Sequence, residues 1–224
     1  MVNELTSGIV KEYGSDAGAA VVGIAASKDF DLAPDGFKPS DNLEKCLSVI
    51  VLGVPFPKES LSGTPNEYTD TRNEMCRRMD AISKDVAKHI KADGHKAKAI
   101  SSIGGKWVNG FSHGHISLKH AAELAGLGVI GKNYLLMSPE HGSLLWFAAV
   151  LTDAELDPDK KAEYSLCDDC NKCVDACPSK ALGNINAFEK KKCAGTCWKM
   201  VDHKWLLVCH TCRKVCPHAF GKTD

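Results

Sequence analysis

The sequence predicts an α/β (α+β) protein in two parts, a sheet domain at residues 1–155 and a small metal-dependent domain at residues 156–224. Three observations lead to this prediction. Apolar runs of strand length alternate with helical patterns through the first part. Nine of the eleven cysteines lie in the last 58 residues. The 224 residues include 44% hydrophobic and 25% charged side chains, which are ordinary values for a folded globular chain.

The first elements alternate between helix and strand. Residues 3–12 are expected to form a short amphipathic helix, and residues 19–27 and 46–54 are apolar runs typical of buried strands. Residues 66–93 are expected to be helical because apolar residues recur every three or four positions. The members of this stripe are Met75, Met79, Ile82, Val86 and Ile90. Gly94 then stands where a carboxy-terminal helix cap is expected.

The later elements complete the predicted sheet domain. Residues 96–103 are expected to form a strand, and residues 116–125 a helix that leads into a glycine-rich loop at 126–133. Residues 144–151 form the last long apolar run. The stretch 152–163 is rich in acid, lysine and proline, so we expect the domain boundary there.

The carboxy-terminal cysteines have the spacing of a bacterial ferredoxin. A first run reads Cys-x2-Cys-x2-Cys-x3-Cys-Pro and a last run reads Cys-x2-Cys-x3-Cys-Pro, with two cysteines between them. A disulfide framework does not suit a chain whose first part is poor in cysteine. A structural zinc site usually takes two Cys-x2-Cys pairs. The ferredoxin pattern fits better, because three closely spaced thiolates bind one cube and the cysteine before proline binds the other.

We therefore predict two 4Fe–4S clusters. The first would be bound by Cys167, Cys170, Cys173 and Cys216, and the second by Cys177, Cys193, Cys209 and Cys212, with Cys197 as the alternative to Cys193. Two intervening residues let the backbone curl around a cube, and proline after the last cysteine turns the chain away. Cys46 and Cys76 are interpreted as ordinary packed thiols.

Charge and hydropathy exclude two function classes. Lys plus Arg and Asp plus Glu each number 28, so the net charge is zero and general attraction to nucleic acid is absent. Any site for a polyanion must be a local patch. No apolar stretch approaches the ~20 residues of a membrane span, and the first residues lack the apolar segment of an export signal. We expect a cytoplasmic protein without membrane contact.

The glycine-rich loop matches the sequence of a dinucleotide-binding motif, but the element that precedes it is not the one that this motif requires. Gly126, Gly128 and Gly131 fit G-x-G-x-x-G, yet a helix precedes them where the dinucleotide motif requires a strand. Two interpretations stay open. The loop is either a tight packing turn or a place where the backbone approaches a large ligand, with Lys132 and Asn133 at its edge.

The string A-G-L-G-x-I-G-K-N-x-L-L at residues 125–136, followed by the double cysteine run, resembles epoxyqueuosine reductases, whose core architecture also occurs in reductive dehalogenases. The resemblance covers residues 15–220. It implies a nitroreductase-like, cobalamin-binding-like sheet domain followed by a ferredoxin-like domain with two 4Fe–4S clusters. It also implies a cobalamin cofactor that receives electrons from the clusters, with flavin as the alternative. The loop residues facing it would be Gly126, Gly128, Gly131, Lys132 and Asn133.

Two departures from this family affect the expected function. The family continues past its last cluster motif into a helical-repeat region that holds tRNA, whereas this chain stops soon after Pro217, so we expect a short form for which tRNA is an unlikely partner. The family's acidic segment has no match, and residues 111–115 hold no carboxylate. His113 and His115 are the candidate proton donors in its place, and ordinary loop histidines are the alternative.

The resulting expectation is an oxidoreductase: a cobalamin- and iron–sulfur-dependent reductase related to epoxyqueuosine reductase. The alternative is an electron-transfer or corrinoid-reducing partner protein without its own small-molecule substrate. Either would take electrons from a protein such as a ferredoxin or flavodoxin. Trp198 and Trp205 are interpreted as packing that excludes water from a cluster, and the lysine run at 189–192 as a solvated surface.

Overall fold

The computed structural model describes residues 4–108, 111–183 and 188–221. The chain forms two compact units. One comprises Met1–Val54, Met75–Gly128 and Trp146–Ala162; the other comprises Pro55–Glu74, Val129–Leu145 and Glu163–Asp224. The chain thus enters the second unit twice before it reaches the cysteine region, which its local composition does not reveal. The predicted boundary after residue 155 stays a prediction.

The first unit is built on a four-stranded sheet in the order β1-β2-β8-β3. The strands are β1 (Val21–Ala26), β2 (Ser48–Pro55), β3 (Ala97–Ile100) and β8 (Leu145–Thr152). β1 pairs antiparallel with β2, and β3 pairs antiparallel with β8. The two inner strands β2 and β8 are buried along almost their whole length, so both have continuous apolar sequences rather than alternating ones. The predicted α/β (α+β) fold class is confirmed.

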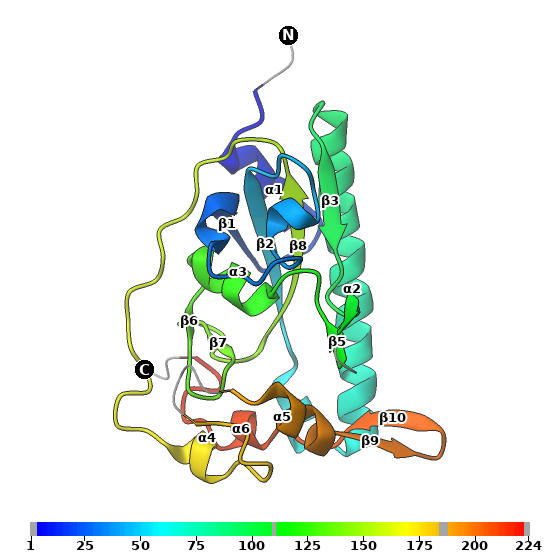
Figure 1. Cartoon of the computed structure of the whole chain (residues 1–224), viewed down its shortest axis with the longest axis vertical. Helices are drawn as coiled ribbons and strands as arrows, with labels where there is room; N and C mark the ends of the chain where they lie inside the picture. Colours follow the sequence, from blue (N-terminus) through cyan, green and yellow to red (C-terminus); the bar gives the residue numbers. More distant parts are fainter. Residues whose placement is uncertain (1–3, 109–110, 184–187, 222–224) are drawn as a thin grey trace. The chain divides into compact units, whose positions relative to one another are not determined.

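Helices cover this sheet. α1 (Ser7–Asp16) and α3 (Leu118–Leu124) both pack against β1. α2 (Pro65–Ala92) is the long helix that Figure 1 draws beside β3, and every member of its predicted apolar stripe is buried. Short 3-10 helices lie at Ser27–Phe30, Pro39–Asp41 and Lys58–Ser62. Within the described ranges, no helix combines the length and the apolar character needed to cross a membrane.

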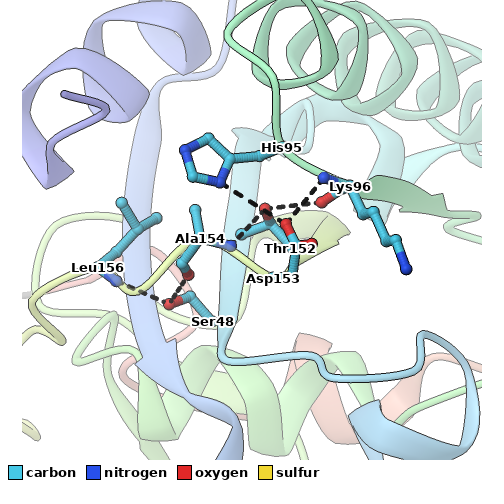
Figure 2. A network of polar contacts seen from close by, with 7 residues as sticks. All are labelled: Ser48, His95, Lys96, Thr152, Asp153, Ala154 and Leu156. Atoms are coloured by element: carbon cyan, nitrogen blue, oxygen red, sulfur yellow. Dashed lines mark hydrogen bonds and ion pairs between the residues drawn. The ribbon is translucent and has the colours of Figure 1, made fainter. Parts of the chain in front are cut away.

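Polar side chains tie the chain leaving β8 to its neighbours (Figure 2). The Thr152 hydroxyl donates to the Lys96 carbonyl at 2.8 Å, and the Asp153 carboxylate accepts the Lys96 amide at 2.8 Å. The buried Ser48 hydroxyl donates to the Ala154 carbonyl at 2.8 Å and accepts the Leu156 amide at 3.0 Å. These bonds satisfy backbone groups that the ladder leaves open, so the segment after β8 is fixed to the sheet.

The remaining elements are short. Two small sheets consist of two strands each. In one, β4 (Lys106–Val108) pairs with β5 (Phe111–His113), and in the other β6 (Val129–Ile130) pairs with β7 (Leu136–Met137). The cysteine region contains α4 (Lys172–Asp175), α5 (Lys190–Cys197), β9 (Trp198–Val201), β10 (Lys204–Leu207) and α6 (Thr211–Lys214). The sequence analysis predicted none of these elements, because they are too short for a helical or alternating pattern to emerge.

Candidate metal centre

Four cysteines from two distant segments line one cavity in the second unit. They are Cys167, Cys170, Cys173 and Cys216. Cys167 and Cys170 lie on the loop that enters α4, Cys173 lies in α4, and Cys216 follows α6, which packs against α4. The cavity is also lined by Asn133, Leu166, Lys172, Pro217 and His218. The proline after the last cysteine therefore lies at the edge of the site.

The thiols of this first group interact electrostatically. Burial, together with the negative charges of Cys167, Cys216 and Cys170, raises the pKa of Cys173 to about 11. Burial also raises the pKa of Cys216, again with contributions from Cys167 and Cys170. Four thiolates this close repel one another unless a cation shares their charge. A soft, all-thiolate donor set of this kind fits a 4Fe–4S cluster.

A second group of thiols gathers around α5. A hydrogen bond with Cys193 raises the pKa of Cys197, as do burial and the charges of Cys193 and Cys209. Burial and, to a smaller extent, the charges of Cys193 and Cys209 raise the pKa of Cys212 to about 11. Cys193 and Cys197 are four residues apart on α5, so they lie on the same helix face.

Cys177 lies in an apolar cluster with members of both groups. Cys173, Cys177, Ala181 and Leu182 form its buried centre, and Cys193, Cys212, Tyr134 and Phe188 are among the side chains packed on it. Burial raises the pKa of the Cys177 thiol, but hydrogen bonds from the Ser179 hydroxyl and backbone amides outweigh burial and leave that pKa lowered. These hydrogen bonds favour the thiolate form of Cys177, and Cys193 packs in its surroundings.

The cysteine ligands of a 4Fe–4S cluster lie farther apart than the ligands of a single metal ion. Among the residues that the structure describes, no three His, Cys, Asp or Glu side chains are arranged around one metal ion. A 4Fe–4S cube takes one thiolate at each iron, so its ligands surround a larger volume than a single ion requires.

His210 connects the second group to Tyr68 at the start of α2 and to Leu61 in the segment before it. The two rings stack at 4.0 Å between centroids with an interplanar angle of 2°. The His210 Nε2 hydrogen-bonds with the Leu61 carbonyl at 3.2 Å. His210 lies between Cys209 and Cys212, so this stack fixes the loop that carries them. The sequence analysis missed it, because nothing local links two residues so far apart in the chain.

The predicted cofactor loop divides into two parts with different surroundings. Gly126 has φ +73° and caps α3: its amide donates to the Glu123 carbonyl at 3.1 Å, and the Leu127 amide donates to the Ala122 carbonyl at 2.9 Å. This pair of bonds is the Schellman cap. A Cβ at Gly126 would lie 2.3 Å from the Lys160 carbonyl oxygen. Gly126 and Gly128 thus belong to a packed turn in the first unit.

The second part of the loop faces the first cysteine group. A Cβ at Gly131 would lie 3.3 Å from the Cys167 sulfur, and Asn133 lines the four-cysteine cavity. The Lys132 Nζ donates to the Asp168 carbonyl and to the Asn171 Oδ1, both at 3.1 Å. The loop between β6 and β7 is therefore fastened to the first cysteine run.

The two candidate proton donors lie in the first unit, apart from the cysteine groups in sequence. His113 ends β5 and its ring lies 5.6 Å from the Phe37 ring. The side-chain Nδ2 of Asn42 donates to the His115 carbonyl at 3.1 Å. The His115 Nδ1 is buried and has no hydrogen-bond partner among the described residues.

Three further residues test the sequence interpretation. Cys46 is buried, its sulfur donates to the Ser48 carbonyl at 3.4 Å, and burial raises its pKa. Cys76 is buried on α2. The interpretation of Trp205 as packing that excludes water is wrong, because this side chain is 57% exposed.

Comparison with known proteins defines the fold class first. A crystal structure of an epoxyqueuosine reductase superposes with a TM-score of 0.65 at 24% identity, covering 94% of this chain and 64% of that one. A catabolic reductive dehalogenase superposes with a TM-score of 0.76 at 21% identity, covering 100% of this chain and 33% of that one. The fold is therefore the one shared by these two kinds of reductase. No protein-family model matches the chain.

Sequence comparison finds relatives among the epoxyqueuosine reductases. The epoxyqueuosine reductase of Lactococcus garvieae is 36% identical over 82% of this chain and 55% of its own length. That of Bacillus subtilis is 25% identical over 94% of this chain and 63% of its own length. The chain is related to epoxyqueuosine reductases, which confirms the resemblance seen in its sequence. It spans about three fifths of the length of these relatives.

The comparisons also overturn one expectation. A further neighbour, with a TM-score of 0.65 and 23% identity over 94% of this chain and 64% of that one, is an epoxyqueuosine reductase with an epoxyqueuosine-modified tRNA stem loop. The expectation that tRNA is an unlikely partner is therefore wrong. It relied on overall charge and on where the chain ends, and neither determines what a local site binds.

Proposed function

We propose that the protein is an iron–sulfur redox enzyme with two 4Fe–4S clusters and a corrinoid cofactor. The first cluster would be held by Cys167, Cys170, Cys173 and Cys216. The second would be held by Cys177, Cys193, Cys209 and Cys212. The observation that carries the proposal is the convergence of the first four thiols on one cavity from segments far apart in the chain.

Cys193 is preferred to Cys197 as the remaining ligand of the second cluster. Cys193 packs in the same apolar cluster as Cys177 and Cys212, and its charge acts on the Cys212 thiol. Cys197 is hydrogen-bonded to Cys193. In this assignment Cys197 lies beside the cluster as a protonated neighbour.

The corrinoid is proposed from the relatives. One structural neighbour, a reductive dehalogenase at 20% identity and TM-score 0.61, has a structure that suggests a mechanism for B12-dependent dehalogenation. When bound, a corrinoid supplies a cobalt centre that can be reduced and can act on a substrate carbon. The chain's part would be to bind and orient the cofactor and to exclude water. The buried, unpartnered Nδ1 of His115 in the described chain suits a group that holds a proton for a ligand.

The substrate that we propose is a modified tRNA nucleoside of the epoxyqueuosine type. This proposal comes from the names of the relatives. The reaction would remove the epoxide oxygen with two electrons and two protons, giving an alkene and water. The clusters would deliver the electrons one at a time.

The first experiment is anaerobic purification followed by iron, acid-labile sulfide and cobalt analysis, with a cobalamin titration monitored by the visible spectrum. About eight irons and eight sulfides per chain are expected for two cubes, together with a spectral change that saturates with cobalamin. About one or two zinc ions without sulfide would refute the cluster assignment. Conversion of epoxyqueuosine-containing tRNA by the loaded protein then tests the substrate.

A second function is favoured by one feature of the sequence. Residues 111–115 hold two histidines but no carboxylate, so the acid expected from the family is missing there. This suits an electron-transfer protein that reduces a partner and has no small substrate of its own. A protein with about eight irons that binds neither cobalamin nor tRNA would support this alternative.

A further inference from the structure

The hairpin of β9 and β10 has an apolar surface that the described chain leaves exposed. Met200 and Trp205 are directly opposite each other across the strands. They are 52% and 57% exposed. An exposed tryptophan paired with a methionine is unusual on a surface without a partner, because both side chains favour burial.

The inner face of the hairpin is the one that packs. Side chains alternate along a strand, so Leu206 and Lys204 share one face of the hairpin and Trp205 lies on the other. Leu206 is buried, the Lys204 Nζ lies 2.8 Å from the Asp70 carboxylate, and the Leu207 amide donates to the Thr69 hydroxyl at 2.9 Å. These contacts fasten one face to the start of α2. The face with Met200 and Trp205 is left outward.

The segments that flank this hairpin in the chain are rich in Lys and Arg. Between residues 189 and 214 there are seven Lys or Arg against two Asp or Glu, in a chain whose net charge is zero. Lys199 on β9 is opposite Leu206 and so starts from the other face of the hairpin, but its side chain is exposed. Lys190 and Lys191 on α5 are exposed as well. The Arg72 guanidinium lies 5.4 Å from the Trp198 ring at the base of the hairpin. An apolar centre within a basic surround complements an acidic protein that has an apolar contact patch.

Both ends of the hairpin lead directly into the second cysteine group. Cys197 immediately precedes β9, and the Val208 amide, just after β10, donates to the Cys197 carbonyl at 2.7 Å. Cys209 follows one residue later. The exposed Trp205 is only four residues from Cys209, so a partner seated on the hairpin would lie near the thiols of this group. Electron transfer requires such proximity, because its rate falls steeply with distance, whereas RNA binding does not require it.

We propose that the β9–β10 hairpin, with Lys199 and the lysines of α5, is the docking surface for an acidic one-electron carrier protein. The reduced carrier gives one electron to the oxidised second cluster, and no atom or proton moves. The inference rests on the proposed function, since it needs a cluster in the second cysteine group. Beyond that function, the proposal specifies the surface through which the electron enters and the acidic character of the donor's contact surface.

The test uses an acidic 2Fe–2S ferredoxin, photoreduced and mixed anaerobically with the cluster-loaded full chain in a stopped-flow spectrometer. Trp205→Ala and Lys199→Glu are each expected to lower the second-order rate constant of cluster reduction about tenfold. The loss for Lys199→Glu should shrink in about 0.5 M salt, where charges are screened. Leu32→Ser and Lys28→Glu are matched controls, since both side chains are exposed in the first unit.

Dithionite separates failure of this proposal from failure of the proposed function. Dithionite is a small reductant that needs no docking surface, so it should reduce the clusters of Trp205→Ala and Lys199→Glu at the normal rate. Ferredoxin rates equal to those of the control variants would overturn the docking proposal and leave the clusters in place. Weaker tRNA binding by the same two variants with unchanged ferredoxin rates would make the hairpin an RNA surface instead. Loss of concentration-dependent self-association with unchanged rates would make it a contact between copies, which also overturns the proposal.

Discussion

Gly126→Ala tests whether the glycine motif is a packed turn. Gly126 has φ +73°, and a Cβ there would lie 2.3 Å from the Lys160 carbonyl oxygen, where ordinary contact begins at 3.4 Å. That carbonyl cannot move alone, because the preceding residue, Asp159, is held to Ile24 by two hydrogen bonds. The Asp159 carboxylate accepts the Ile24 amide at 2.9 Å, and the Asp159 amide donates to the Ile24 carbonyl at 2.8 Å. We therefore expect two costs, one for the left-handed backbone and one for the clash.

Gly94→Ala supplies the matched control. Gly94 caps α2 with the same two bonds: its amide donates to the Lys91 carbonyl at 3.1 Å and the His95 amide donates to the Ile90 carbonyl at 3.3 Å. It has φ +92°, but a Cβ there would meet nothing within 4 Å. Alanine at Gly94 should thus cost only the left-handed backbone, about 1 kcal/mol. Alanine at Gly126 should cost about 3 kcal/mol, because overpacking adds about 2 kcal/mol.

The assay is anaerobic thermal unfolding of both variants, followed by far-ultraviolet circular dichroism. At about 3 °C per kcal/mol for a chain of this size, the midpoint should fall by about 3 °C for Gly94→Ala and about 9 °C for Gly126→Ala. Equal shifts would refute the packing argument. A Gly126→Ala variant with unchanged stability but lost cobalamin binding would instead place that residue against a ligand.

Three further predictions follow from the thiols and one histidine. Cys216→Ser should lower the iron content from about eight to about four per chain, whereas Cys76→Ser, which changes a buried thiol on α2, should leave it unchanged. Cys193→Ser should lower the iron content in the same way and Cys197→Ser should not; the reverse pattern would exchange their roles. Burial, and to a smaller extent a neighbouring lysine, lowers the pKa of His120. The unfolded chain then binds more protons below about pH 6.5, so stability should fall as the pH drops towards 5, and His120→Gln should reduce that fall in an anaerobic urea titration.

Much of the first unit was predictable from local sequence. The α2 stripe has a helical period over many turns, and the buried strands β2 and β8 are long apolar runs. Patterns of this length report which face is buried, and burial determines the element. The short hairpins escaped prediction, since two to four residues carry no period. The β9–β10 hairpin is therefore a product of the structure alone.

The cysteine spacing and the glycine motif show the same division. Spacing predicted that Cys216 would join Cys167, Cys170 and Cys173, and the structure brings these four side chains to one cavity; that they bind iron stays a prediction. The match to the glycine motif placed Gly126 and Gly131 in one loop. The structure assigns Gly126 to a helix cap and Gly131 to the wall of the cysteine site.

The sequence by itself determined the fold class, the family relationship and the set of thiols, because periodicity and spacing are properties of neighbouring residues. Only the tertiary structure decided which thiols meet and which tryptophan is exposed. It also decided that His210 stacks on Tyr68. Such contacts join residues far apart in the chain, and their geometry depends on how every intervening segment packs.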